Sequence, residues 1–68
     1  MKDNIIQAED FLNRAYILQP KDVNIIQMLA AVNLKIGNKD KTAGLYRKLL
    51  EINPDDPVAK FGLTQMGQ

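Results

Sequence analysis

The 68-residue sequence contains no cysteine, no histidine and no tryptophan. Without cysteine the chain can form neither disulfide bonds nor thiolate-bound zinc or iron–sulfur sites. Without histidine it lacks the commonest general base and metal ligand. Aromatic residues make up only 6% of the chain, which leaves few rings for base stacking. We therefore expect no metal centre, no cofactor and no stacking surface for single-stranded nucleic acid.

An excess of charge and long apolar runs are also lacking. Nine basic and eight acidic residues give a net charge of +1, which creates no strong field toward nucleic acid or an anionic membrane. No apolar run approaches the roughly 20 residues of a membrane span, and the N-terminus lacks the apolar segment of a signal peptide. We expect a soluble protein without membrane insertion. Its compartment is unknown: cytoplasmic by default, periplasmic if the chain is a fragment of a longer one.

Apolar residues, which form 46% of the chain, recur at helical spacing in four segments. We predict helices over 5–18, 23–36, 40–53 and 57–66, in one domain or domain fragment that spans 1–68, with Asn4 and Gln7 as a capping pair for the first. Pro20 and Pro54 end the first and third segments, and Gly37 supplies a left-handed turn after the second. Strand signals are absent, so the sequence predicts an all-α fold of antiparallel neighbouring helices.

The second half of the sequence repeats features of the first. A shift of 34 places Pro20 on Pro54, Asp22 on Asp56, Leu29 on Leu63 and Asn4 on Asn38. Similar residues coincide at Phe11 and Leu45, Leu12 and Tyr46, Ala15 and Leu49, and Leu18 and Ile52. The identities fall at a proline stop, a helix cap, a packing position and a turn. Such placement indicates two copies of one helical unit.

These residues resemble the tetratricopeptide repeat (TPR) family, whose unit of about 34 residues is a helix A, a turn and a helix B. One complete unit spans 23–56, with Ile26, Leu29, Ala30 and Asn33 at the pattern positions of helix A, and Thr42, Tyr46, Leu49 and Pro54 at those of helix B. Upstream, Ala8, Leu12, Ala15 and Pro20 match a helix B. Downstream, Lys60, Leu63, Thr64 and Gly67 fall on the positions of a further helix A.

The resemblance implies a short right-handed superhelix of stacked hairpins in the order B–A–B–A, with 57–66 as a capping helix of the A type. Ile26, Asn33 and Thr42 depart from the residues that the family prefers. The alternative is an unrelated four-helix bundle in which the spacing of the two prolines is a coincidence. Both interpretations predict four helices and no strand.

The sequence offers no catalytic constellation, and we expect no enzyme. No carboxylate pair sits in an apolar context that would raise a pKa for acid–base chemistry. Asp22, Asp40, Asp55 and Asp56 lie at helix starts, where capping explains them. Thr42 and Thr64 have no base partner that could make a nucleophile.

Binding is the function that the sequence favours. The A helices of the TPR family line the concave surface of the superhelix, and concave surfaces are where solenoids bind. The resemblance therefore implies a non-catalytic scaffold that binds a peptide or protein segment. The expected contact residues are Asn24, Gln27, Ala31, Leu34, Lys35, Phe61 and Gln65.

Two further functions are open. A chain that opens with a helix B leaves an apolar face uncovered, so we expect an association site at Ile5, Ile6, Phe11 and Tyr16, and a homodimer. A structural module that self-associates or extends an array is the alternative to the scaffold. The weaker third reading is nucleic-acid binding through Lys35, Lys39, Lys41, Arg47 and Lys48, which we do not expect because aromatic residues are not interleaved with them.

Overall fold

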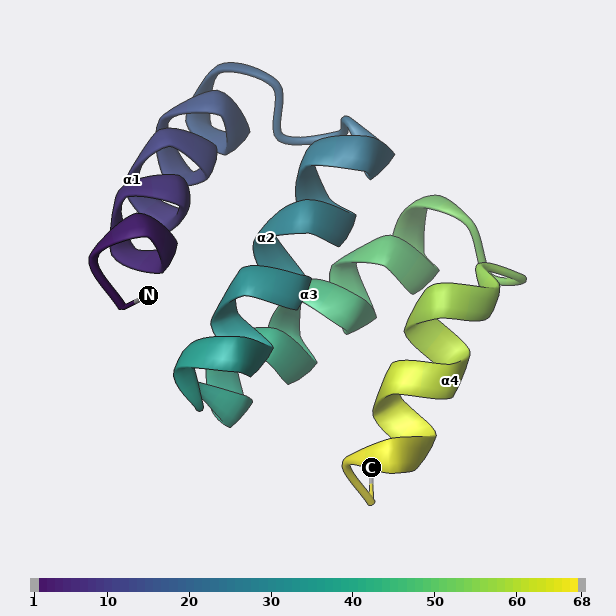
Figure 1. Cartoon of the computed structure of the whole chain (residues 1–68). Coiled ribbons are helices and arrows are strands. Elements are labelled where there is room, and N and C mark those ends of the chain that lie inside the picture. Colours follow the sequence, from purple (N-terminus) through teal and green to yellow (C-terminus); the bar gives the residue numbers. More distant parts are fainter. Residues whose placement is uncertain (1, 68) are drawn as a thin grey trace.

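The computed structural model describes residues 2–67, and side chains from residue 4 onward. It contains four helices, α1 (Lys2–Leu18), α2 (Val23–Ile36), α3 (Lys39–Ile52) and α4 (Pro57–Gln65), and no strand within the described part of the chain (Figure 1). The all-α prediction with four helices is confirmed. The first helix begins three residues earlier than predicted. Asn4 therefore lies inside α1 and does not cap it, because no proline or glycine interrupts the residues before it.

The two proline turns have the same local structure. In the first, the backbone N–H of Asp22 donates to the carbonyl of Gln19, and the Asp22 carboxylate accepts from the N–H of Ile25. In the second, one repeat period later, Asp56 donates to Asn53 and accepts from Ala59 in the same way. Each aspartate is the N-cap of the helix that follows, since its carboxylate satisfies an orphan N–H of the first turn. The hydrogen bonds of the turn therefore recur with the same period as the sequence.

The turn between α2 and α3 depends on Gly37. Its φ of 93° lies in the left-handed region, which costs glycine little because it has no Cβ. The N–H of Gly37 donates to Asn33 and Leu34, and the N–H of Asn38 donates to Asn33 at 2.9 Å, so the last carbonyls of α2 are satisfied. Asn38 makes no side-chain bond to the start of α3. This turn makes α2 and α3 a tight hairpin.

The hydrophobic core lies mainly between α2 and α3. Ile26, Leu29, Ala30 and Leu49 are fully buried, and Tyr46 is nearly so. Leu12 of α1 and Ala59 of α4 join the same cluster from the two sides. The central hairpin thus carries the core, and the outer helices close it.

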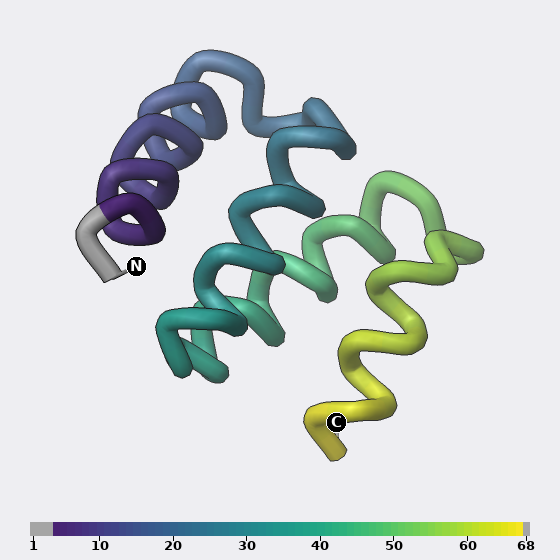
Figure 2. Tube along the Cα trace, in the orientation of Figure 1, coloured from purple at the N-terminus to yellow at the C-terminus, as the bar shows by residue number. Residues whose placement is uncertain are grey.

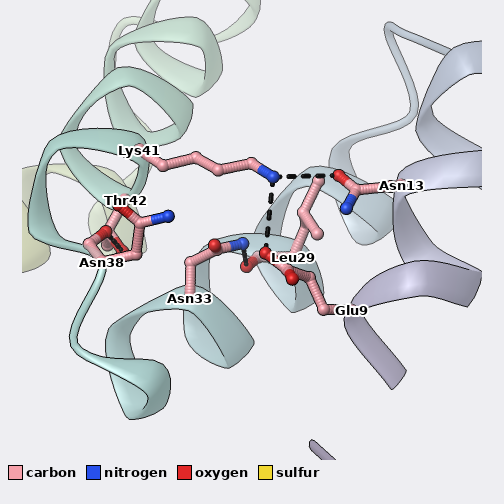
Figure 3. Close-up of polar contacts among 7 residues, drawn as sticks. All are labelled: Glu9, Asn13, Leu29, Asn33, Asn38, Lys41 and Thr42. Atoms are coloured by element: carbon pink, nitrogen blue, oxygen red, sulfur yellow. Dashed lines mark hydrogen bonds and ion pairs between the residues drawn. The ribbon is translucent and has the colours of Figure 1, made fainter. Parts of the chain in front are cut away.

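The helices pack in chain order. The extensive contacts are α1 on α2, α2 on α3 and α3 on α4, and α1 and α4 lie on opposite sides of the central hairpin (Figure 2). The Cα atoms span 32 × 26 × 15 Å, a flat shape about two helices thick. A polar contact also joins α1 to α3, because the ammonium of Lys41 lies 3.4 Å from Glu9 Oε2 and 3.2 Å from Asn13 Oδ1 (Figure 3). The four helices form an open stack rather than a closed ring.

Helix α4 buries a different stripe from the one that the family pattern implies. Ala59 and Gly62 are buried, whereas Lys60 and Thr64 are exposed. The physical reason is that α4 packs extensively on α3 alone, so only the stripe that faces α3 is covered. Lys60 and Thr64, which fall on helix A positions of the family pattern, therefore do not pack in this helix.

Candidate binding surface

A groove of about 440 Å³ runs along α4, between α4 and the C-terminal end of α2, with α3 beneath it. Leu34 of α2 forms one wall, and Val58, Phe61, Gln65 and Met66 form the other. Lys39 and Tyr46 contribute from α3. The lining is mostly apolar, which is usual for a site that binds a ligand by burial.

Phe61 is the most prominent apolar side chain of the groove. It is 67% exposed, and Leu34 and Val58 nearby are 46% and 44% exposed. An apolar ligand could therefore remove from water a surface that the folded chain leaves open. The structure places the Phe61 side chain at the surface, where a contact residue has to lie.

The groove has a floor because Gly62 lets α4 approach Tyr46. A Cβ on Gly62 would lie 2.5 Å from Cζ of the Tyr46 ring and 2.8 Å from Cδ2, distances that no ordinary packing allows. Tyr46 of α3 is 5% exposed, and its ring lies against Gly62 of α4. Glycine at this position thus sets the depth of the groove.

One charged group stands at the groove. Lys39, at the first residue of α3, is exposed, and no ion pair joins it to an acid among the described residues. Gln65 adds an amide that can donate and accept hydrogen bonds. The groove therefore offers an apolar lining, one cation and one amide.

The structure divides the residues predicted for the concave face into three groups. Leu34, Phe61 and Gln65 come together in the groove. Gln27 is half-buried and donates from Nε2 to Asp56 Oδ2 at 3.2 Å, which links α2 to the cap of α4. The remaining residues, Asn24, Ala31 and Lys35, are exposed on α2 outside the groove.

The prediction did not include Lys39, Tyr46, Gly62 and Met66 among the contact residues. The spacing of Val58, Phe61, Gly62 and Gln65 at three and four residues is a helical face that could have indicated Gly62. No pattern in the sequence shows that Tyr46 of α3 lies beneath that face, because this depends on how α4 is rolled.

The residues predicted for self-association do not form one patch. Ile6 and Phe11 are 56% and 70% exposed, whereas Ile5 is half-buried and Tyr16 packs against the core. Ile5 and Ile6 line a second hollow of about 250 Å³ with Lys35 and Ile36 of α2. Phe11 lies outside this hollow.

The basic cluster is partly engaged within the chain. Lys41 contacts Glu9 and Asn13 of α1, and Lys48 lies 3.8 Å from Glu51 Oε2. Lys35 and Lys39 belong to different hollows. The cluster is therefore not one continuous cationic surface.

None of the helices in the described part of the chain has an apolar stretch long enough to cross a membrane. Among the described residues, no group of three or more acidic, histidine or cysteine side chains gathers where a metal ion could be held. Comparisons of the chain with protein-family models, with curated proteins and with solved structures each found no match.

Proposed function

We propose that this chain is a non-catalytic, TPR-like scaffold module that binds a peptide segment in the groove between α2 and α4. The observation that carries the proposal is the exposed Phe61 in an apolar groove to which three helices contribute. Exposed aromatic side chains at the centre of such surfaces are frequent hot spots of binding.

The TPR-like arrangement has structural support in the repeated turn. The matched hydrogen bonds at Asp22 and Asp56 recur at the spacing of the sequence repeat. Within 23–56 the positions that the family pattern uses for packing are buried in both helices, namely Ile26, Leu29, Ala30, Asn33, Thr42, Tyr46 and Leu49. A right-handed superhelix of stacked hairpins agrees with this burial, with α2 and α4 as its A helices.

The chemistry of the groove specifies the kind of peptide. A leucine or phenylalanine side chain of the ligand would lie against Phe61, Leu34 and Val58, where burial of apolar surface supplies most of the binding energy. A carboxylate a few residues away would pair with the ammonium of Lys39. We therefore expect a short apolar segment that carries one acidic residue.

Selection from a displayed library of short random peptides, followed by titration of the selected peptides, tests the proposal. The wild-type chain should enrich peptides with apolar anchors and an acid. The substitution F61A should weaken their binding by more than about tenfold, since it removes the central anchor. The substitution K39E should weaken acidic peptides and spare matched peptides in which lysine replaces the acid.

The matched control is F11A. Phe11 is 70% exposed, nearly as much as Phe61, but it lies on α1 away from the groove. Peptide affinity should stay within about twofold of wild type in this variant. If no peptide is enriched, or if affinity survives F61A, the groove is not the binding site.

A further inference from the structure

Helix α1 has a largely apolar stripe that the rest of the described chain leaves mostly exposed. Phe11 and Leu18 are 70% and 80% exposed, and Asn4 and Ala8 are also exposed. With the half-buried Ala15, these residues recur at intervals of four and three: Asn4, Ala8, Phe11, Ala15 and Leu18. This stripe, here called the outer seam, has the spacing by which one helix packs along another in a coiled coil.

Helix α3 shows what the same positions do when they are covered. Leu45, which corresponds to Phe11 in the sequence repeat, is 6% exposed. Leu49, which corresponds to Ala15, is fully buried, and Ile52, which corresponds to Leu18, is 36% exposed. The core that includes α2 covers Leu45 and Leu49. The outer seam is therefore a helix-packing surface without its helix.

The order of side-chain sizes along the outer seam favours a second copy as the occupant. Small and large residues alternate as Ala8, Phe11, Ala15 and Leu18. Suppose that two α1 helices pair antiparallel about a twofold axis at the level of residue 13. Phe11 of each copy then lies opposite Ala15 of the other, and Leu18 lies opposite Ala8. A parallel pair would place Phe11 opposite Phe11, where the side chains would be crowded. It would place Ala8 opposite Ala8, where a void would remain. The seam is thus complementary to itself in the antiparallel orientation.

Charge agrees with a pairing of identical surfaces. The outer seam contains no charged residue, and Arg14 at its edge is paired with Asp10 of the same helix at 3.1 Å. Like charges are therefore not brought together at the seam itself. Helix α4 of a second copy would fit the outer seam less well. Its Lys60 and Thr64 occupy the repeat positions of Ile26 and Ala30, the buried residues with which α2 packs.

We infer that two copies of this chain associate through an antiparallel α1–α1 contact along the outer seam. A single helix pair buries an area at the low end for specific complexes, below about 1,200 Å². The dimer is therefore weak and depends on concentration. This inference concerns α1 and is independent of peptide binding at the groove.

Light scattering and sedimentation of the whole chain between about 10 µM and 1 mM measure the association, in a range suited to a weak complex. The mass should rise from monomer toward dimer. The substitutions F11E and L18E should each raise the dissociation constant at least about tenfold, because they place a charge in the seam. Both side chains are exposed, so circular dichroism should show an unchanged fold in each variant.

Ile17→Glu is the matched control for Leu18→Glu. Ile17 is 76% exposed and adjacent to Leu18 in sequence, but it lies about 100° away around the helix, outside the seam. I17E should dimerise as wild type does. A chain that remains monomeric throughout the range, or a dimer that survives F11E, would overturn the inference. So would a peptide that shifts the NMR signals of α1 in a monomeric chain, since the seam would then receive a different partner.

Cysteine substitution tests the orientation, and the chain has no cysteine of its own. A mixture of the A8C and L18C variants should form a disulfide between the two copies, since these positions are opposed in the antiparallel pair. A8C alone should form none, because its two copies lie about ten residues apart along the helix, beyond the reach of a disulfide. Cross-linking of A8C with itself would overturn the antiparallel orientation.

Discussion

At Gly62, α4 lies directly against the Tyr46 ring of α3. The Tyr46 ring occupies the space that a side chain at position 62 would need. We expect G62A to lower the free energy of unfolding by about 1–2 kcal/mol, since overpacking costs more than alanine gains in helix propensity. Urea denaturation measures this difference.

Gly44 provides the opposite case on α3. It is exposed, and nothing lies within 4 Å of the Cβ that alanine would add. The same change, G44A, should raise the free energy of unfolding by up to about 1 kcal/mol, as expected for a glycine within a helix. Equal effects of G62A and G44A would show that the Tyr46 contact does not limit α4.

Asn33 shows that a fully buried position in the core need not be apolar. Its Nδ2 donates to the carbonyl of Leu29 at 2.8 Å, while its Oδ1 has no partner among the described residues. The Oδ1 atom therefore bears the cost of desolvation without a hydrogen bond in return. At this residue the packing of α2 is not optimised for stability.

At the scale of elements, the two capping aspartates differ in the number of hydrogen bonds that their carboxylates accept. Asp22 accepts one bond from Ile25, whereas Asp56 accepts from Ala59 and also from Gln27 of α2. Asp56 is 2% exposed. It therefore fixes both the start of α4 and the position of α4 relative to α2, which forms the opposite wall of the groove.

We expect D56A to destabilise the chain by about 2 kcal/mol and D22A by about 1 kcal/mol, because D56A loses a cap and an interhelical hydrogen bond. Thermal or urea denaturation compares them. D56N should cost less than D56A, since asparagine keeps an oxygen that can accept from Ala59. A cycle with Q27A separates the two contributions of Asp56, and additive effects of D56A and Q27A would argue against the interhelical bond.

At the scale of the whole molecule, the open stack makes stability uneven. The core lies in the α2–α3 hairpin, whereas α4 is a short helix with two buried residues. Each outer helix packs extensively on one neighbour. Elements with few buried contacts open at lower free energy than the core.

Native-state hydrogen exchange should therefore show the slowest amides in α2 and α3 and faster exchange in α1 and α4. Protection of α1 should increase with protein concentration if the outer seam pairs two copies, whereas protection of α4 should not. Uniform protection of all four helices would instead indicate one all-or-none cooperative unit.

The sequence by itself determined the elements. The apolar spacing, the two prolines, Gly37 and the aspartate caps predicted four helices whose bounds agree with the structure to within one residue, apart from the start of α1. These signals are local: a cap, a stop or a left-handed turn depends on residues a few positions away. The repeat is also visible in the sequence, because the proline and the aspartate of the turn both occur twice.

Only the tertiary structure decided which faces are covered. The roll of α4 brings Ala59 and Gly62 onto α3 and leaves Phe61 in the open, although all three are small or apolar. The same spacing in α1 and α3 gives an exposed Phe11 and a buried Leu45. Burial depends on which other helices are near, and a short helix with one neighbour has several apolar orientations of similar energy. The groove and the outer seam could therefore not be assigned from the sequence alone.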